Sequence, residues 1–315
     1  MNDPTFHHAT LARCFVKADF RRDSKLLEED YRVAVVDAAV QRANLGFNDI
    51  IILESELRKN KVYRLADLSD QLIVRHINKT IRRVTGVKQA NRTAIVNSIV
   101  RLSEEGLPFR VYKLDIANFY ETTDPKIAIE RARRDDAYST HFTALLRSFF
   151  VSMAASNILG LPRGLSISAT LSELLMRDFD RDAMDDDRVQ YYARFVDDIV
   201  IITSGKENPR DFLRELRKRL IPGIDFNYKK TRIFSLSPFN SAYNNYLSID
   251  AQFDFLGYQI SIHHTQRTDG RLSRKVLLDL SKKKERRVKS RLYLSFASYR
   301  SDGDFNSLLQ RIRLL

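Results

Sequence analysis

One stretch of sequence decides the fold: Gln190-Tyr191-Tyr192-Ala193-Arg194-Phe195-Val196-Asp197-Asp198-Ile199-Val200-Ile201-Ile202-Thr203. Two strand-like runs, 190–195 and 199–203, are joined by a segment that is too short for anything except a tight hairpin. An Asp-Asp pair in a turn is usually just a polar turn. Asp197-Asp198 differs because it lies between two apolar strands, where a nearby dication would offset the concentrated negative charge.

A second strand is expected upstream, over Val111–Ile116. Its alternation places Tyr112 and Leu114 on one face and Asp115 on the other, so we expect Asp115 near the strand end and facing away from the core. The ends of neighbouring strands can bring three carboxylates to a pair of Mg²⁺ ions about 3.5–4 Å apart. That arrangement serves in-line phosphoryl transfer.

Helices and further strands are expected around these two segments. Apolar helices are predicted from about 142 to 161 and from about 168 to 184, and strands over Ile224–Tyr228 and Phe253–Ile262. Arg147 within the first helix would cost at least ~2.5 kcal/mol in a bilayer, which favours a buried helix of a soluble protein over a membrane span. The N-terminus has no signal-peptide pattern, and a cytoplasmic protein is expected.

The charge balance predicts a polyanionic partner. Lys and Arg number 53 against 40 Asp and Glu, which gives a net charge of +13. Residues 1–110 are expected to be mostly helical, and the 71–92 segment, which has no acidic residue, predicts a helix with a basic face. A second basic helix is expected over 271–291. A solvated charged face is the alternative for both. The single cysteine, Cys14, excludes a disulfide framework and four-cysteine metal sites.

Five motifs in order resemble those of reverse transcriptases, over roughly residues 75–262. Leu114–Tyr120 resembles the first catalytic motif, and Gly160–Ser168 resembles the second palm motif, which usually contains Leu-Pro-Gln-Gly. Phe195–Asp198 is similar to the Tyr-x-Asp-Asp box. Lys230-Thr231 and Phe255–Tyr258 resemble a later palm motif and the primer grip.

Within that family the chain most resembles the bacterial antiviral members, the abortive-infection and defence-associated groups. The features that carry this resemblance are Lys88–Arg92, Asn118–Glu121 and Gly164–Ala169, in which alanine replaces the usual proline. Arg163 stands where glutamine is usual, and Phe195 stands where tyrosine is usual. Both departures leave the carboxylates in place and bear on templated fidelity.

The resemblance implies a role for each motif residue. Asp115, Asp197 and Asp198 would be catalytic. Two Mg²⁺ ions would be held by Asp115, Asp197 and the carbonyl of Ile116, with Asp198 adding charge. Nucleotide contacts are expected from Lys88, Arg92, Tyr120, Arg163, Gly164 and Lys230. Primer contacts are expected from Gly257 and Tyr258. The charge of the two basic segments, and not the resemblance, predicts backbone contacts to nucleic acid from Arg82, Arg83, Lys282, Lys283 and Lys284.

Several of these roles have plain structural alternatives. Lys88 and Arg92 could be surface charge, and Lys230 could protonate the leaving group, contact a phosphate or face solvent. Gly257 and Tyr258 could serve only strand packing. Tyr120 could be a gate against ribonucleotides or a second core aromatic.

Together these observations predict an α+β right-hand polymerase. Helical fingers are expected over 1–108, an RRM-like antiparallel-sheet palm over 109–264 and a basic helical thumb over 265–315. The implied function is Mg²⁺-dependent RNA-directed DNA synthesis in bacterial antiphage defence, in the cytoplasm. Template-independent or protein-primed synthesis and a non-catalytic RNA-binding scaffold are the alternatives. The implied partners are an RNA template, which a dedicated noncoding RNA could supply, the DNA product and deoxynucleotides. A second reverse transcriptase subunit or a homo-oligomer stays open, and no membrane is expected.

Overall fold

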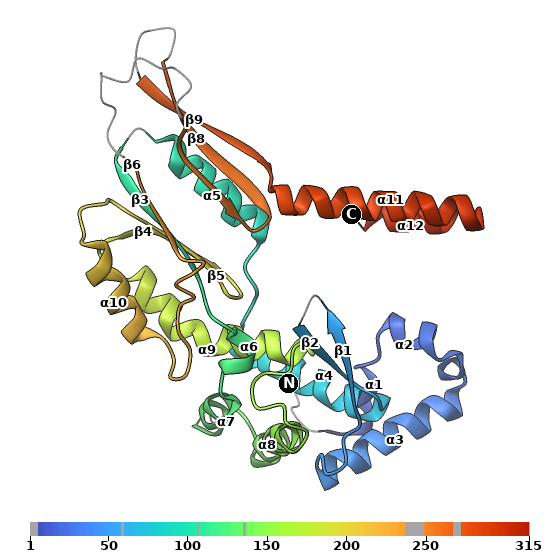
Figure 1. Cartoon of the computed structure of the whole chain (residues 1–315). Coiled ribbons are helices and arrows are strands. Elements are labelled where there is room, and N and C mark those ends of the chain that lie inside the picture. Colours follow the sequence, from blue (N-terminus) through green and yellow to red (C-terminus); the bar gives the residue numbers. More distant parts are fainter. Residues whose placement is uncertain are drawn as a thin grey trace. The chain divides into compact units, whose positions relative to one another are not determined.

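The computed structural model describes residues 6–57, 60–105, 107–134, 137–236, 249–266 and 272–314 (Figure 1). The chain forms two compact units, and each unit is assembled from three separate segments. The first unit contains Met1–Gln89, Asp115–Asp186 and Pro209–Lys229. The second contains Ala90–Leu114, Asp187–Asn208 and Lys230–Leu315. The chain therefore passes between the two units several times.

The first unit is mostly helical. In chain order its elements are α1 (His8–Ala12), α2 (Lys17–Arg22), the 3₁₀ helix η1 (Ser24–Leu27), α3 (Glu29–Leu45), β1 (Ile52–Leu57), β2 (Asn60–Leu65), α4 (Leu68–Thr85), α6 (Phe119–Thr122), α7 (Pro125–Arg134), α8 (Thr140–Ala155), α9 (Ser166–Met184) and α10 (Pro209–Arg219). One apolar cluster, to which α4, α8 and α9 contribute most, forms its core.

The three helices of this core were expected from the sequence. Ile73, Ile77 and Ile81 of α4 are at most 1% exposed, so the predicted apolar stripe is confirmed. Helix α8 covers most of the first apolar stretch, and Arg147 within it lies at the surface. In the part of the chain that the structure describes, no helix has the length and apolar character needed to cross a bilayer.

The hairpin β1–β2 was not expected from the sequence. Its strands pair antiparallel from Ile52 opposite Leu65 to Leu57 opposite Asn60. Most β1 residues are exposed, so the strand lacks the apolar alternation by which a half-buried strand is recognised.

The second unit contains two antiparallel sheets. Its elements are α5 (Arg92–Glu104), β3 (Phe109–Asp115), β4 (Val189–Phe195), β5 (Asp198–Thr203), β6 (Arg232–Leu236), β7 (Ile249–Phe255), β8 (Tyr258–Gln266), β9 (Leu272–Leu280), α11 (Lys282–Asp302) and α12 (Phe305–Arg313). The strand orders are β4-β5-β3-β6 and β7-β8-β9. Residues of α5 and of both sheets form a second apolar cluster. The mixed helix-and-sheet composition is therefore confirmed.

Three strand and helix predictions are corrected. The single strand expected over Phe253–Ile262 is a hairpin, because Leu256 and Gly257 adopt φ values of 49° and 85° and turn the chain. Ile224–Tyr228 is no strand and contributes one isolated bridge, between Phe226 and Ile116. The 271–291 segment begins as strand β9, since Leu272–Leu280 pairs along β8, and only then becomes a helix. Arg271 lies outside the described residues.

Helix α11 begins where its cap allows. The Ser281 hydroxyl accepts the backbone N–H of Lys284, which fixes the first turn at Lys282. Helices α11 and α12 then pack side by side, with the rings of Tyr299 and Phe305 6.2 Å apart (Figure 1).

Candidate active site

The β4–β5 hairpin has a two-residue turn, and the Asp-Asp pair spans the end of this turn and the start of β5. Phe195 pairs with Asp198, so Val196 and Asp197 form the turn and Asp198 opens β5. The hairpin predicted from the sequence is therefore confirmed. Val196 adopts a φ of 60°, which a β-branched residue rarely does. Backbone strain of this kind tends to occur at functional sites.

A buried arginine supports this turn, and sequence reasoning missed it. Arg194 is only 6% exposed, and its Nη1 donates a 3.0 Å hydrogen bond to the carbonyl oxygen of Val196. The sequence feature that could have identified Arg194 is its position within an apolar strand, because a buried charge without a partner would be energetically costly there. Both Asp197 and Asp198 are half-buried.

Strand β3, which ends at Asp115, lies next to β5 in the same sheet. At the other end of the pair, an added Cβ on Gly205, just after β5, would lie 3.8 Å from the backbone nitrogen of Arg110, near the start of β3. The two strands therefore run in opposite directions, and β3 ends at the edge where β5 begins.

Asp115 does not face away from the core as expected. It is 6% exposed, and the strand face that it shares with Phe109 and Val111 packs against the second apolar cluster. Both faces of β3 are buried. The alternation in its sequence therefore does not mark one face as facing the core and the other as facing solvent. The chain after Asp115 is held by backbone bonds, since Asn227 N–H donates to the Asp115 carbonyl at 2.7 Å.

The donor chemistry of these residues suits a hard cation. Carboxylate and backbone carbonyl oxygens are the ligands that Mg²⁺ takes in proteins. Among the residues that the structure describes, no three or more His, Cys, Asp or Glu side chains form a group that could hold a metal ion.

The first unit brings Tyr120, Arg163 and Gly164 together. The guanidinium carbon of Arg163 lies 4.9 Å from the centre of the Tyr120 ring, and Arg163 also pairs with Glu121 at 2.9 Å. Glu121 is a site residue that sequence reasoning missed as such. Gly164 has a φ of 101°, and a Cβ there would meet Val62 of β2 at 2.5 Å, so only glycine fits.

A cavity of about 490 Å³ opens beside this cluster. Asn118, Glu121 and Arg163 line it together with β2 and the 157–161 segment. The unexpected β1–β2 hairpin adds Lys61 and Tyr63 to its wall. The cavity is therefore lined by two of the motifs that the sequence singled out and by one element that it did not.

The basic residues expected at the nucleotide are divided between the units. Lys88 belongs to the first unit and Arg92 to the second, and both are exposed. Arg92 lies against the β4–β5 hairpin, with its guanidinium carbon 4.6 Å from the centre of the Phe195 ring. Lys230 is exposed just before β6. Arg82 and Arg83 are exposed in the last turn of α4.

The expected primer-grip residues meet the start of α11. The Lys284 ammonium lies 4.2 Å from the centre of the Tyr258 ring, and a Cβ on Gly257 would lie 3.0 Å from the same lysine side chain. Ser281 N–H donates to the Gly257 carbonyl at 3.0 Å. Lys282 and Lys283, in the first turn of α11, are exposed.

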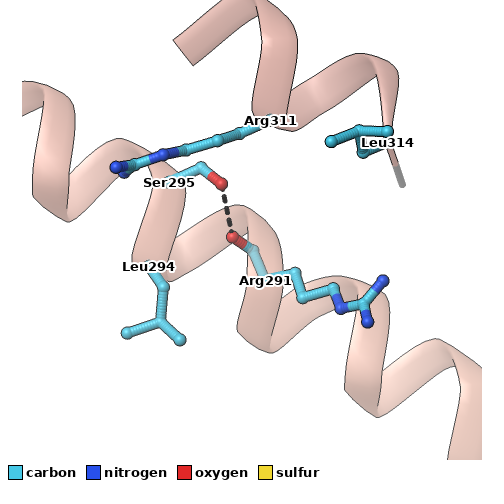
Figure 2. Close-up of a pocket in the computed structure, with 5 residues that line it drawn as sticks. All are labelled: Arg291, Leu294, Ser295, Arg311 and Leu314. Carbon is cyan, nitrogen blue, oxygen red and sulfur yellow. Dashed lines mark hydrogen bonds between the residues drawn. The ribbon is translucent and has the colours of Figure 1, made fainter. Parts of the chain in front are cut away.

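A different cavity, of about 420 Å³, lies between α11 and α12. Figure 2 shows Arg291, Leu294 and Ser295 on α11, with Arg311 and Leu314 contributed from α12 and its end. The Ser295 hydroxyl donates to the Arg291 carbonyl at 2.8 Å, so it is engaged within its own helix. None of the motif residues lines this cavity.

Comparisons with known proteins place these residues in a family. A family model described as "Reverse transcriptase (RNA-dependent DNA polymerase)" matches residues 59–260, more than half of the chain. The match includes both aspartate motifs, Tyr120, Arg163 and Tyr258, and it ends before α11. No curated protein matches the chain.

Solved structures of telomerase are similar at low identity. Apo telomerase from Candida tropicalis is 12% identical, with a TM-score of 0.46, and the match covers 68% of this chain and 46% of that one. Telomerase from Candida albicans in complex with a TWJ fragment of telomeric RNA is also 12% identical, with a TM-score of 0.42, over 88% and 56% of the two chains. The match therefore spans about half the length of those telomerase chains.

Proposed function

The chain belongs to the reverse transcriptase family, and we propose that it is an RNA-directed DNA polymerase, a nucleotidyltransferase that extends DNA on an RNA template. One observation supports this most directly. The hairpin turn with Asp197 and Asp198 begins β5 at the sheet edge where β3 ends at Asp115. Carboxylates at adjacent strand ends are what two-metal phosphoryl transfer requires.

In this proposal Asp115, Asp197 and the Ile116 carbonyl would hold two Mg²⁺ ions, and Asp198 would add negative charge. The chemistry supplied by such ions would be activation of the attacking hydroxyl and neutralisation of charge on the triphosphate and pyrophosphate. The protein supplies fixed ligands: the Asp115 carbonyl is bonded to Asn227, and Arg194 holds the turn through the Val196 carbonyl. Each bond restrains the backbone beside one of the proposed ligands.

On the nucleotide side, we assign Tyr120, Arg163 and Gly164 to the incoming deoxynucleotide, with Lys88, Arg92 and Lys230 near its phosphates. Tyr120 is partly buried against the first apolar cluster, so one edge of its ring is left for a ligand. A ring beneath the sugar would leave a ribose 2′-hydroxyl without space or a hydrogen-bond partner. This favours deoxynucleotides.

The nucleic acid itself would be gripped by basic side chains. We assign the primer end to Gly257 and Tyr258, and the backbone phosphates to Arg82, Arg83 and the lysines of the first turn of α11. The contact of Lys284 with Tyr258 supports a shared role for these two sets. Lys and Arg contacts to phosphates bind without reading sequence.

The wider role in this proposal is bacterial antiphage defence in the cytoplasm, based on the antiviral motif resemblance. Residues 1–108, 109–264 and 265–315 would act as fingers, palm and thumb. A structured RNA, dedicated to this protein, would supply the template. The basic residues on both sides of the palm segment support this, because a short primer would need fewer.

Primer extension with purified protein tests the proposal. Asp197→Asn should reduce deoxynucleotide incorporation roughly a thousandfold, since metal ligation contributes several kcal/mol to the transition state. Asp254→Asn is the matched control, because Asp254 is an exposed carboxylate beside the other hairpin turn of the same unit. Chelation of Mg²⁺ should mimic the first variant and not the second.

Three outcomes of these assays distinguish RNA-directed synthesis from the two alternative functions. Incorporation that needs added RNA supports RNA-directed synthesis. Incorporation by RNA-free protein without any template would replace it with template-independent or protein-primed synthesis. RNA binding without incorporation on any template, with Mg²⁺ present, would indicate a scaffold that binds RNA and has no catalysis.

A further inference from the structure

We propose that Glu121 and Arg163 are positioning residues, whose ion pair holds the ring of Tyr120 and so sets the preference for deoxyribonucleotides over ribonucleotides. The inference rests on the proposed function, since it takes Tyr120 to lie beside the incoming sugar. It adds Glu121 as a residue that acts through others, and it gives Arg163, already assigned to the nucleotide, the further role of holding Tyr120.

The geometry of the pair is that of a fixed fork. Arg163 Nη2 donates to both Glu121 carboxylate oxygens, at 2.9 Å and 3.1 Å, and Arg163 Nε donates to Glu121 Oε1 at 3.0 Å. A guanidinium held at three points cannot rotate freely. Its plane is therefore kept over the Tyr120 ring, with 4.9 Å between the guanidinium carbon and the ring centre.

The backbone around the ring is locked by the same segment of chain. Leu161 N–H donates to the Tyr120 carbonyl at 2.7 Å, and a Cβ on Gly160 would come within 2.3 Å of that carbonyl oxygen. The Arg163 carbonyl in turn accepts the Tyr63 N–H of β2 at 2.7 Å. Residues 160–163 thus fix both the main chain of Tyr120 and one side of its ring.

The Glu121–Arg163 ion pair contributes little to the stability of the fold. The Arg163 and Glu121 side chains are 31% and 51% exposed, and ion pairs so open to water contribute little to folding. The Tyr120 ring also packs against the first apolar cluster, and its centre lies 5.8 Å from the centre of the buried Phe119 ring. The pair adds the contact with the guanidinium, and we expect a ring held by all these contacts not to move aside for a 2′-hydroxyl.

The experiment compares single-nucleotide extension with deoxy- and ribonucleotides in three variants: Glu121→Gln, Arg163→Gln and the double variant. Each single change should lower the preference, measured as the ratio of kcat/KM values, about two- to fivefold, the factor expected for a lost cation–π contact. The change should fall on the ribonucleotide KM, and in Glu121→Gln, which alters no residue assigned to nucleotide binding, the deoxynucleotide kcat should stay within about twofold. The double variant should be no worse than the poorer single variant, because both act through one contact.

The matched control is the pair Arg131–Asp178, in the same unit. Its side chains are 35% and 51% exposed, close to the values for Arg163 and Glu121, and its shortest N–O distance is 3.1 Å. Arg131→Gln and Asp178→Asn should leave the preference ratio unchanged. A general effect of removing a surface charge would change it in both pairs.

An unchanged preference in folded Glu121→Gln and Arg163→Gln proteins overturns the inference. Arg163→Lys guards against misfolding, since it keeps the charge and loses the fork; it should lower the preference as Arg163→Gln does. If the wild type incorporates no nucleotide, the proposed function fails separately. The pair is then judged by equilibrium binding of dATP and ATP, where a preference for dATP should shrink in the variants, and its absence in the wild type overturns the inference.

Discussion

Two hairpin turns of the second unit share one form and differ in what they hold. In both, two residues join the strands: Phe195 pairs with Asp198 across one turn, and Phe255 pairs with Tyr258 across the other. In both, a cation lies over an aromatic ring next to the turn, Arg92 over Phe195 at 4.6 Å and Lys284 over Tyr258 at 4.2 Å.

The difference lies in how each turn accommodates positive φ. The β7–β8 turn places Leu256 at a φ of 49° and Gly257 at 85°, and only the glycine adopts this conformation without steric cost. The β4–β5 turn places Val196 at 60°, where a branched side chain is strained. Both turns therefore hold a non-glycine residue at positive φ, but only the turn that holds the carboxylates uses a β-branched one. The residue least suited to this conformation thus lies where we propose the chemistry.

The largest expected effect concerns α11, whose Lys284 packs against Gly257 of the β7–β8 turn. Changing Lys282, Lys283 and Lys284 together to Gln should weaken binding to all nucleic-acid sequences alike. It should also lower the slope of log K against log salt by up to ~0.9 for each lost duplex contact. Binding measured at several salt concentrations gives this slope.

The control for that variant removes the same charge elsewhere. Lys17, Lys25 and Lys126 are exposed lysines of the first unit, and their joint change to Gln lowers the net charge equally. If both triple variants lower the slope equally, α11 has no special contact with the nucleic-acid backbone.

Gly257→Ala should have the next largest effect. The new Cβ would sit at a φ of 85° and 3.0 Å from the Lys284 side chain. The free energy of unfolding should therefore fall by about 1–2 kcal/mol, the cost of a left-handed conformation for a residue with a Cβ. Urea unfolding measures it, and Gly303→Ala is a useful comparison, since its φ is 67° but no atom lies within 4 Å of its Cβ. A smaller loss at Gly257 than at Gly303 would contradict the role of the Lys284 contact.

The sequence predicted those elements whose pattern is strong and local. The hairpin around Asp197 and the apolar helices α4, α8 and α9 each carry a periodicity that the structure confirms. The β1–β2 hairpin could not be predicted, because β1 is exposed and has no alternation of apolar residues. The basic residues of 271–291 predict a helix, but Leu272–Leu280 forms strand β9 because it pairs with β8, and a single sequence does not show that tertiary contact.

The candidate site was predicted residue by residue, but not its supports. Tyr120, Arg163 and Gly164 lie together, as expected of residues in two adjacent motifs. The residues that hold the site in place could not be predicted from the sequence. Glu121 became meaningful only through its bonds to Arg163, and Arg194 only through its bond to the Val196 carbonyl. A single sequence shows which residue types are present, whereas pairing across more than 40 positions depends on the folded chain.

Val196→Gly gives the smallest effect and the sharpest test of the comparison, because its sign is opposite to that of Gly257→Ala. The φ of 60° costs a branched residue roughly 1–2 kcal/mol. Glycine removes that cost but adds roughly 0.5–1 kcal/mol of chain entropy in the unfolded state. The free energy of unfolding should therefore rise, by at most about 1.5 kcal/mol, with the midpoint in urea moving up at constant slope. Leu256→Gly supplies the control. Leu256 also has a positive φ, of 49°, but it is 9% exposed and belongs to the second apolar cluster, so lost packing should make that variant less stable.

The activity of Val196→Gly should fall while its stability rises, since a turn that is free to relax no longer holds Asp197 in one place. A Val196→Gly protein that is less stable than wild type would mean that the valine is not strained in the folded protein, and that the two turns differ only in their charge.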